Sequence, residues 1–197
     1  MTEEDAPASG ASIERGEKDL PTVTKDGVPL TTNIDGVVVS QPPVHVDHRG
    51  ALVEMYMSPE FWNAPFAYAY QTSIRPGMLK GWFAHEKKLD RYHIVSGELL
   101  VLLYDNRPGS PTRGMSQKLV LSERSARQVL IPPLVWHLSL NVGTEDAILV
   151  NLPSTHYDHA NPDRFYFSID SGEIPVDVRS FFPVTFSGPQ HIAGTFA

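Results

Sequence analysis

Cysteine is absent from the 197-residue chain. Without thiols the chain forms no disulfide, holds no zinc through sulfur and offers no thiol nucleophile. Long apolar runs are missing too, and none approaches the ~18 consecutive apolar residues of a membrane-spanning helix. The first residues, MTEEDAPASG, are charged and lack the apolar centre of a signal peptide. We therefore expect a cytoplasmic protein without a membrane partner.

Positive charge is also scarce. Lys and Arg together number 16 against 23 Asp and Glu, which gives a net charge of −7. The basic residues form no stripe that would follow a phosphate backbone. We expect no nucleic-acid partner.

Helical periodicity is nearly absent, and short β-rich runs take its place. Examples are GVVVSQP, ALVEMYM, RYHIVSGELLVLLYD and WHLSLNVG. They carry β-branched and aromatic residues, and Gly, Pro, Asn and Asp separate them at intervals of about 8–12 residues. This pattern is typical of an all-β sandwich or barrel.

The composition divides the chain into three parts. Residues 1–22 are small, charged and unpatterned, which predicts a short disordered tail. Residues 23–180 carry the β-rich runs and form the predicted barrel domain. Residues 181–197, FFPVTFSGPQHIAGTFA, are apolar but contain Pro and Gly, and we expect this extension to pack on the barrel or on a partner subunit.

Two segments resemble the motifs of cupins. GMLKGWFAHEKKLDRYHIVSG is similar to the first motif, which runs Gly, five residues, His-x-His, three or four residues, Glu, six residues, Gly. Phe83 replaces the first His of that motif and Asp90 replaces its Glu. PPLVWHLSLN is similar to the second motif through His137 and Asn141. The resemblance implies a cupin jelly-roll barrel, also called a double-stranded β-helix.

Strand geometry predicts which of these side chains meet. Because side chains alternate between faces, Phe83 and His85 point the same way, as do His137 and Ser139. If the two strands are neighbours in a closed barrel, His85, Asp90 and His137 converge on one cavity. Two His and one carboxylate can also hold a divalent metal such as iron. A metal at these three residues is the alternative to our expectation that no cofactor is bound.

A more particular resemblance covers most of the chain after Val46. The blocks DHRGALVEMY, GMLKGWFAH, YDNRPGSPTRG and IPPLVWH are similar, in the same order, to segments of the dTDP-4-dehydrorhamnose 3,5-epimerase family. The resemblance implies a metal-independent homodimer that binds a nucleotide-linked 4-keto sugar. In that family a His removes protons beside the ketone and a Tyr protonates the opposite face.

The resemblance places the catalytic His of the family on Phe83 and its acid Tyr on Asn151. Because Phe accepts no proton, the standard double epimerisation is not expected. GWFAHEK also resembles the G-x-H-A-H-K segment of dTDP-sugar 3,4-ketoisomerases, whose second His matches His85. We therefore expect His85 to be the base, and Tyr157, in THYDHANPD, or a water to be the acid.

The motifs and the resemblance together give two sets of candidate residues. The predicted catalytic residues are His85, Asp90, His137 and Tyr157. The predicted substrate-binding residues are Arg49, Glu54, Lys80, Trp82, Phe83, Arg107, Ser139 and Asn151. Arg49 and Lys80 are expected to bind the diphosphate of an anionic small-molecule substrate, and Trp82 with Phe83 to form a stacking wall.

The leading hypothesis is an epimerase or ketoisomerase that moves a proton beside the ketone of an activated sugar. The apolar residue at Phe83 leaves two alternatives open. One is a diverged cupin isomerase, cyclase or dehydratase of a specialised biosynthetic pathway that acts on a non-sugar substrate. The other is a cupin that binds a ligand without catalysis, in which His85 and His137 are structural cavity residues.

Overall fold

The computed structural model describes residues 19–27, 30, 32–56 and 65–182. Most of the predicted tail, residues 1–18, and most of the predicted extension, residues 183–197, lie outside the described part, and the two predicted boundaries stay predictions. The chain divides into two compact units, residues 1–32 and 33–197. In the first unit the backbone N–H of Leu30 donates to the carbonyl of Thr22, 2.9 Å away.

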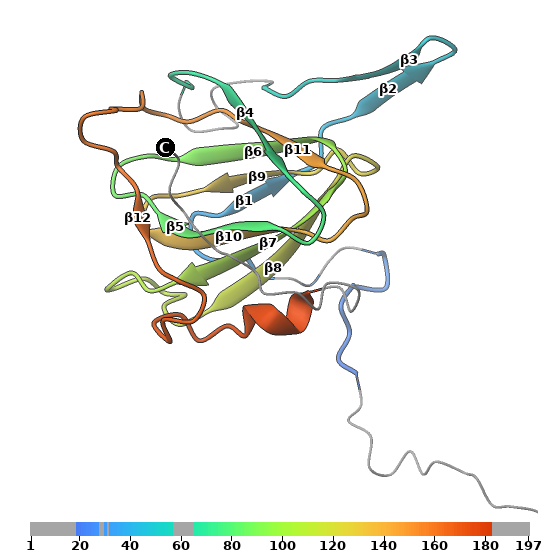
Figure 1. Ribbon diagram of the computed structural model, residues 1–197. Coiled ribbons are helices and arrows are strands. Elements are labelled where there is room, and N and C mark those ends of the chain that lie inside the picture. Colours follow the sequence, from blue (N-terminus) through green and yellow to red (C-terminus); the bar gives the residue numbers. More distant parts are fainter. Residues whose placement is uncertain (1–18, 28–29, 31, 57–64, 183–197) are drawn as a thin grey trace, which may run out of the picture. The chain divides into compact units, whose positions relative to one another are not determined.

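The second unit is built from antiparallel strands (Figure 1). The first sheet has the order β1 (Val38–Ser40), β9 (Gln128–Ile131), β6 (Asp90–Ser96), β11 (Ala147–Asn151), β4 (Tyr70–Ile74). The second has the order β12 (Phe165–Tyr166), β5 (Leu79–Ala84), β10 (Val135–Asn141), β7 (Glu98–Asp105), β8 (Ser116–Ser122). β2 (Val44–Asp47) and β3 (Gly50–Val53) form a separate hairpin, and one 3-10 helix spans Val178–Phe181. The predicted all-β class is confirmed.

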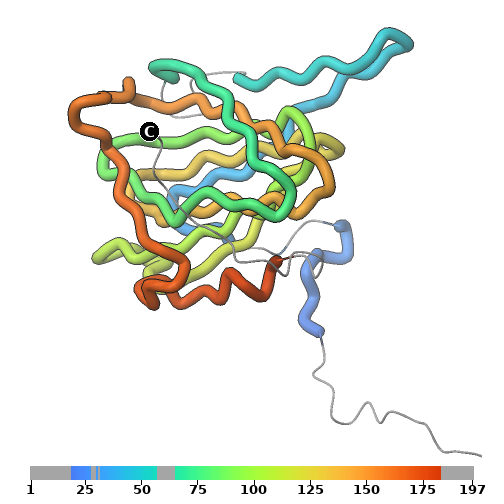
Figure 2. Tube along the Cα trace, viewed as in Figure 1, coloured from blue at the N-terminus to red at the C-terminus, as the bar shows by residue number. Residues whose placement is uncertain are grey.

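Two hydrophobic clusters hold this unit together. In β7 the side chains of Leu99, Val101 and Leu103 belong to a cluster that draws on both sheets and therefore lies between them. Leu100 and Leu102 point the other way, into a second cluster on the outer face of the second sheet. The chain after β12 runs back along that sheet and covers this cluster (Figure 2). Burial on both faces explains why β7 reads as an uninterrupted apolar run.

A bulge in β5 decides which of its side chains face the interior. His137 of β10 pairs with Phe83, but Ser139 pairs with Lys80, so three steps along β5 oppose two along β10. The extra residue interrupts the alternation of faces. Lys80 and Phe83 consequently both reach the interior cavity, while Trp82 turns into the outer cluster.

Gly81 makes this bulge possible. Its φ is +130°, a conformation that side-chain-bearing residues rarely adopt. A Cβ at this position would lie 2.7 Å from the carbonyl oxygen of His137. Only glycine lets β5 approach β10 this closely.

No helix within the described residues is long and apolar enough to cross a membrane.

Candidate active site

A cavity of about 630 Å³ opens between the two sheets. β4 and β6 of the first sheet contribute Tyr70, Thr72 and Asp90, while β5 and β10 of the second contribute Lys80 and His137. The volume lies within the range of small-molecule sites in proteins.

Three predicted residues meet in this cavity: His85, Asp90 and His137. The Nε2 atom of His85 lies 3.1 Å from Asp90 Oδ2, and the Nε2 atom of His137 lies 3.5 Å from the same oxygen. All three side chains are buried, and the two imidazole centres are 5.3 Å apart. We refer to these residues as the His–Asp–His cluster.

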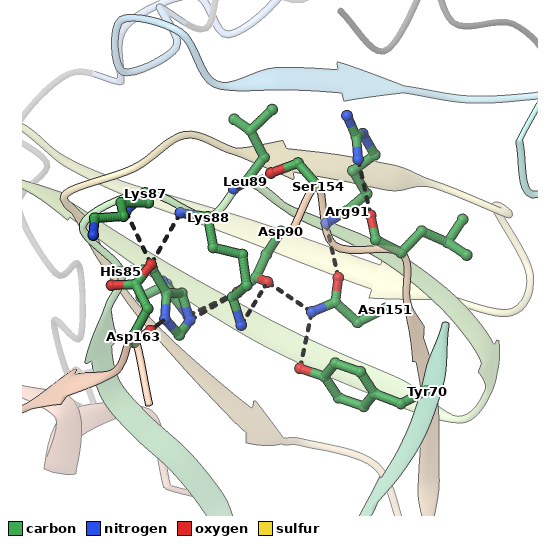
Figure 3. A network of polar contacts seen from close by, with 12 residues as sticks. Tyr70, His85, Lys87, Lys88, Leu89, Asp90, Arg91, Asn151, Ser154 and Asp163 are labelled. Atoms are coloured by element: carbon green, nitrogen blue, oxygen red, sulfur yellow. Dashed lines mark hydrogen bonds and ion pairs between the residues drawn. The ribbon is translucent and has the colours of Figure 1, made fainter. Parts of the chain in front are cut away.

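The orientation of His85 is fixed from the loop before β12 (Figure 3). His85 Nδ1 contacts the carbonyl oxygen of Asp163. The carboxylate of Asp163 in turn accepts the backbone N–H groups of Glu86, Lys87 and Lys88 at 2.7, 2.9 and 3.1 Å. Asp163 therefore ties the segment between β5 and β6 to the loop opposite.

Both histidines present Nε2 to the carboxylate of Asp90. His137 Nδ1 lies 3.1 Å from the carbonyl oxygen of Val135, as His85 Nδ1 contacts that of Asp163. Because a carbonyl oxygen only accepts hydrogen bonds, each Nδ1 carries a hydrogen. Nε2 is then the nitrogen of each ring that is available for proton exchange.

Charge in the cluster is balanced around Asp90. Its Oδ1 receives the Lys88 ammonium at 3.2 Å and a hydrogen bond from Asn151 Nδ2 at 2.8 Å. Burial alone would raise the pKa of Asp90, but the hydrogen bond from His85 and the nearby positive charges hold it below the usual range. Burial lowers the pKa of His137 to about 4, so its imidazole is neutral at physiological pH.

The three donor atoms of the cluster lie within 4.8 Å of one another. Their number and type suit a divalent cation. However, the Lys88 ammonium already lies beside Asp90 and supplies the positive charge that a buried carboxylate needs. The arrangement therefore requires no metal, and cofactor independence stays a prediction.

A second polar group extends from Asp90 towards β4. The side chain of Asn151 bonds to Asp90 and, through Nδ2, to the hydroxyl of Tyr70 at 2.9 Å (Figure 3). Its Oδ1 accepts the backbone N–H of Arg91 at 2.9 Å. The sequence predicted Asn151 to bind substrate, and the structure places it behind Tyr70 as a buried link in this network.

Other predicted residues also line the cavity. Lys80 donates to Thr72 Oγ1 at 2.5 Å, and burial lowers the pKa of its ammonium. Ser139 and Phe83 lie nearby, and Tyr157 packs its ring edge on His159 with centres 4.8 Å apart.

Besides Asn151, four predicted substrate-binding residues lie outside the lining of this cavity. Trp82 is buried in the outer cluster because it directly precedes Phe83 in β5 and so points to the opposite face. Arg107 is held by Asp105, with Nε 2.9 Å from Oδ1 and Nη2 2.8 Å from Oδ2. Arg49 is exposed in the turn of the β2–β3 hairpin, and Glu54 is exposed beyond the end of β3.

The cavity residues that the sequence analysis missed include Tyr70, Lys88 and Arg164. The guanidinium of Arg164 lies 5.1 Å above the ring of Phe83. Tyr68, Tyr70 and Thr72 alternate in AYAYQTSI, so the period of a strand could have predicted a shared face. Lys88 and Arg164 lie in segments without such a pattern.

Known proteins resemble this chain in sequence. The model of the dTDP-4-dehydrorhamnose 3,5-epimerase family matches residues 31–185. The probable low-salt glycan biosynthesis epimerase Agl13 of Haloferax volcanii is 32% identical over 134 residues, which cover 67% of this chain and 86% of the relative. The spore coat polysaccharide biosynthesis protein SpsL of Bacillus subtilis is 30% identical over 131 residues, which cover 66% of this chain and 87% of the relative.

Solved structures agree with these matches. The dTDP sugar isomerase of Desulfovibrio desulfuricans has a TM-score of 0.67 at 25% identity, covering 73% of this chain and 90% of its own. ChmJ, a 3'-monoepimerase from Streptomyces bikiniensis solved with dTDP-quinovose, has a TM-score of 0.66 at 25% identity, covering 74% and 76%. The predicted cupin barrel is confirmed. The chain belongs to the dTDP-4-dehydrorhamnose 3,5-epimerase family, whose members are sugar-nucleotide epimerases.

Proposed function

We propose that this protein epimerises a dTDP-4-keto sugar by moving a proton at a carbon beside the ketone, and that the His–Asp–His cluster carries the transfer. The observation behind the proposal is that two imidazole Nε2 atoms converge on one buried carboxylate inside a cavity of substrate size. Family membership supplies the substrate class, and the dTDP-sugar complex of ChmJ supports it.

His137 is the proton acceptor in this proposal. Its ring is neutral at physiological pH, and its Nε2 lies 3.5 Å from Asp90, too far for an ordinary hydrogen bond. His85 is closer to the carboxylate and has both ring nitrogens engaged, so it orients Asp90 and shares the proton. Asp90 stabilises the imidazolium that forms.

The electrons of the broken C–H bond move to the ketone oxygen and give an enolate. Lys88 lies in the cavity with its ammonium 3.2 Å from Asp90 and can stabilise that oxygen. Lys80 binds an anionic part of the substrate further along β5. A proton returned to the same carbon from the opposite face completes the inversion.

We further propose that the double epimerisation does not occur. Phe83 stands where the family resemblance places the catalytic His, and its ring packs edge-on against His137 with centres 6.5 Å apart. A base remains on only one side of the substrate, which favours reaction at a single carbon.

Ketoisomerisation is the second candidate. Two imidazoles 5.3 Å apart on one side of the cavity also suit a proton shift between neighbouring positions on one face of a sugar. The product distinguishes the two reactions, because a ketoisomerase moves the carbonyl whereas an epimerase inverts a carbon and keeps it.

The proposal is tested by incubating the purified protein with dTDP-4-keto-6-deoxyglucose and identifying the product by NMR. We expect an epimer, with turnover lowered on the order of 100-fold or more by His137→Ala and by His85→Ala. His45→Ala, an exposed histidine of β2, is the matched control and should keep wild-type turnover. Calorimetric binding of dTDP shows whether each variant retains its site. Wild-type turnover in both cavity variants would refute the assignment.

Removal of metal ions tests cofactor independence. Because Lys88 supplies the positive charge beside Asp90, dialysis against a strong chelator should leave turnover unchanged. Loss of turnover that added Fe²⁺, Mn²⁺ or Zn²⁺ restores would contradict this expectation.

We also propose a homodimer in which the β2–β3 hairpin contacts a second copy. The hairpin extends beyond the two sheets (Figure 1), and among the described strands β2 and β3 pair only with each other. Val46 and Leu52 on it are 74% and 59% exposed. Burial of these side chains would favour association.

A further inference from the structure

We infer that Tyr70 is the catalytic acid that returns the proton to the substrate on the face opposite the histidines. The inference rests on the proposed function, which requires a proton donor across the sugar from His137. The network of Asp90, Asn151 and Tyr70 in Figure 3 carries it.

The side-chain amide of Asn151 has only one orientation that satisfies its neighbours. The backbone N–H of Arg91 donates to its oxygen at 2.9 Å, so this atom is Oδ1. The amide nitrogen then faces Asp90 Oδ1 at 2.8 Å and the Tyr70 hydroxyl at 2.9 Å. A carboxylate only accepts, so Nδ2 uses one hydrogen for Asp90 and the other for Tyr70.

This arrangement fixes the role of the Tyr70 oxygen. Because the oxygen accepts from Asn151, the hydroxyl hydrogen of Tyr70 is directed elsewhere. Tyr70 lines the cavity, so a substrate atom there can accept that hydrogen. Burial and the negative charge of Asp90 raise the pKa of Tyr70, so the phenol is protonated at physiological pH.

The acid and the base come from opposite walls. Tyr70 lies on β4 of the first sheet, whereas His137 lies on β10 of the second, and both side chains line the cavity between the sheets. In the inferred arrangement a sugar ring lies between the phenol on one face and the imidazole on the other. The C–H hydrogen passes to His137 Nε2, and the Tyr70 hydrogen passes to the same carbon of the enolate. The phenolate then regains a proton from solvent, and the His137 imidazolium releases its proton to solvent, which restores both groups.

The three other tyrosines of the cavity, Tyr68, Tyr92 and Tyr157, are less suited. The ring of Tyr68 stacks on that of Tyr70 with centres 5.6 Å apart, and no described residue forms a hydrogen bond with its hydroxyl. The ring of Tyr157 packs on His159, and among the described residues no donor holds its hydroxyl. Tyr92 belongs to the core between the sheets and its ring meets His137 at 6.0 Å, on the side of the base. Among the described cavity tyrosines, only Tyr70 has a hydroxyl that is hydrogen-bonded to a buried side chain.

The test separates removal of the proton from its return. Wild-type protein and Tyr70→Phe are incubated with dTDP-4-keto-6-deoxyglucose in D2O, and NMR follows deuterium entry beside the ketone and formation of the epimer. We expect Tyr70→Phe to retain deuterium entry in the starting sugar, because His137 still acts, while epimer formation falls on the order of 100-fold. Tyr166→Phe, at an exposed tyrosine of β12, is the matched control and should behave as wild type.

Four results would overturn the inference. Epimer formation by Tyr70→Phe at the wild-type rate would exclude its hydroxyl as the acid. Loss of epimer formation in Tyr157→Phe but not in Tyr70→Phe would show that Tyr157 is the acid. Equal loss of deuterium entry and epimer in Tyr70→Phe would mean that the hydroxyl supports the base. If the wild-type protein itself introduces no deuterium, the proposed function fails and the inference fails with it.

Discussion

The two cavity histidines differ in how closely they approach Asp90. His85 Nε2 lies 3.1 Å from the carboxylate and His137 Nε2 lies 3.5 Å from it. A buried pair next to one carboxylate does not hold two positive charges easily, because each charged ring loses hydration and repels the other. This asymmetry is the physical basis for assigning proton abstraction to His137.

The lowered pKa of His137 predicts a pH dependence of stability. His137 binds a proton near pH 6.5 in the unfolded chain but only near pH 4 in the folded protein. The stability that the neutral imidazole contributes is therefore complete above pH 6.5 and is lost as the pH falls towards 4. The free energy of unfolding in urea should therefore fall by about 2 kcal/mol between pH 7 and pH 5. His137→Gln should remove this dependence of the unfolding free energy on pH, and His45→Gln should keep it. An unchanged slope in His137→Gln would contradict the account.

At the level of elements, the bulge in β5 determines which residues form the cavity. Strict alternation would place Lys80 and Phe83 on opposite faces, and the extra residue brings both inside. The sequence offers no periodic sign of this bulge, so alternation along β5 does not predict that Lys80 shares the cavity with Phe83. Trp82 lies outside the cavity by alternation alone, because it directly precedes Phe83.

Gly81→Ala tests the importance of the bulge. The added Cβ would lie 2.7 Å from the backbone of β10, and alanine rarely adopts a φ of +130°. We therefore expect the free energy of unfolding to fall by roughly 2–5 kcal/mol and turnover to drop. Gly109→Ala is the matched control, because its φ is +79° and nothing lies within 4 Å of its Cβ. Urea denaturation measures both variants, and equal losses would contradict a special role for Gly81.

The sequence predicts site residues that lie in local motifs, but it does not predict those that depend on contacts between distant segments. His85, Asp90 and His137 lie in two motifs whose spacing is visible along the chain, and the structure brings them together. The link from Asp90 through Asn151 to Tyr70 depends on the register of β4 against β11, which no local pattern specifies. The anchoring of His85 by Asp163 likewise joins residues far apart in sequence.

At the scale of the whole molecule, the exposed hairpin predicts self-association. Analytical ultracentrifugation should find a dimer, and replacing Val46 and Leu52 together by Asp should give a folded monomer, because charges there cannot be buried without partners. A wild-type monomer at micromolar concentration would contradict the proposed interface.

The most direct test of the central claim is solvent deuterium entry into dTDP-4-keto-6-deoxyglucose, followed by NMR with the wild-type protein and His137→Ala. The account predicts deuterium at one carbon beside the ketone with the wild-type protein and none above background with the variant. Binding of the sugar nucleotide by the wild-type protein without deuterium entry would contradict it and indicate a cupin that binds its ligand without moving a proton.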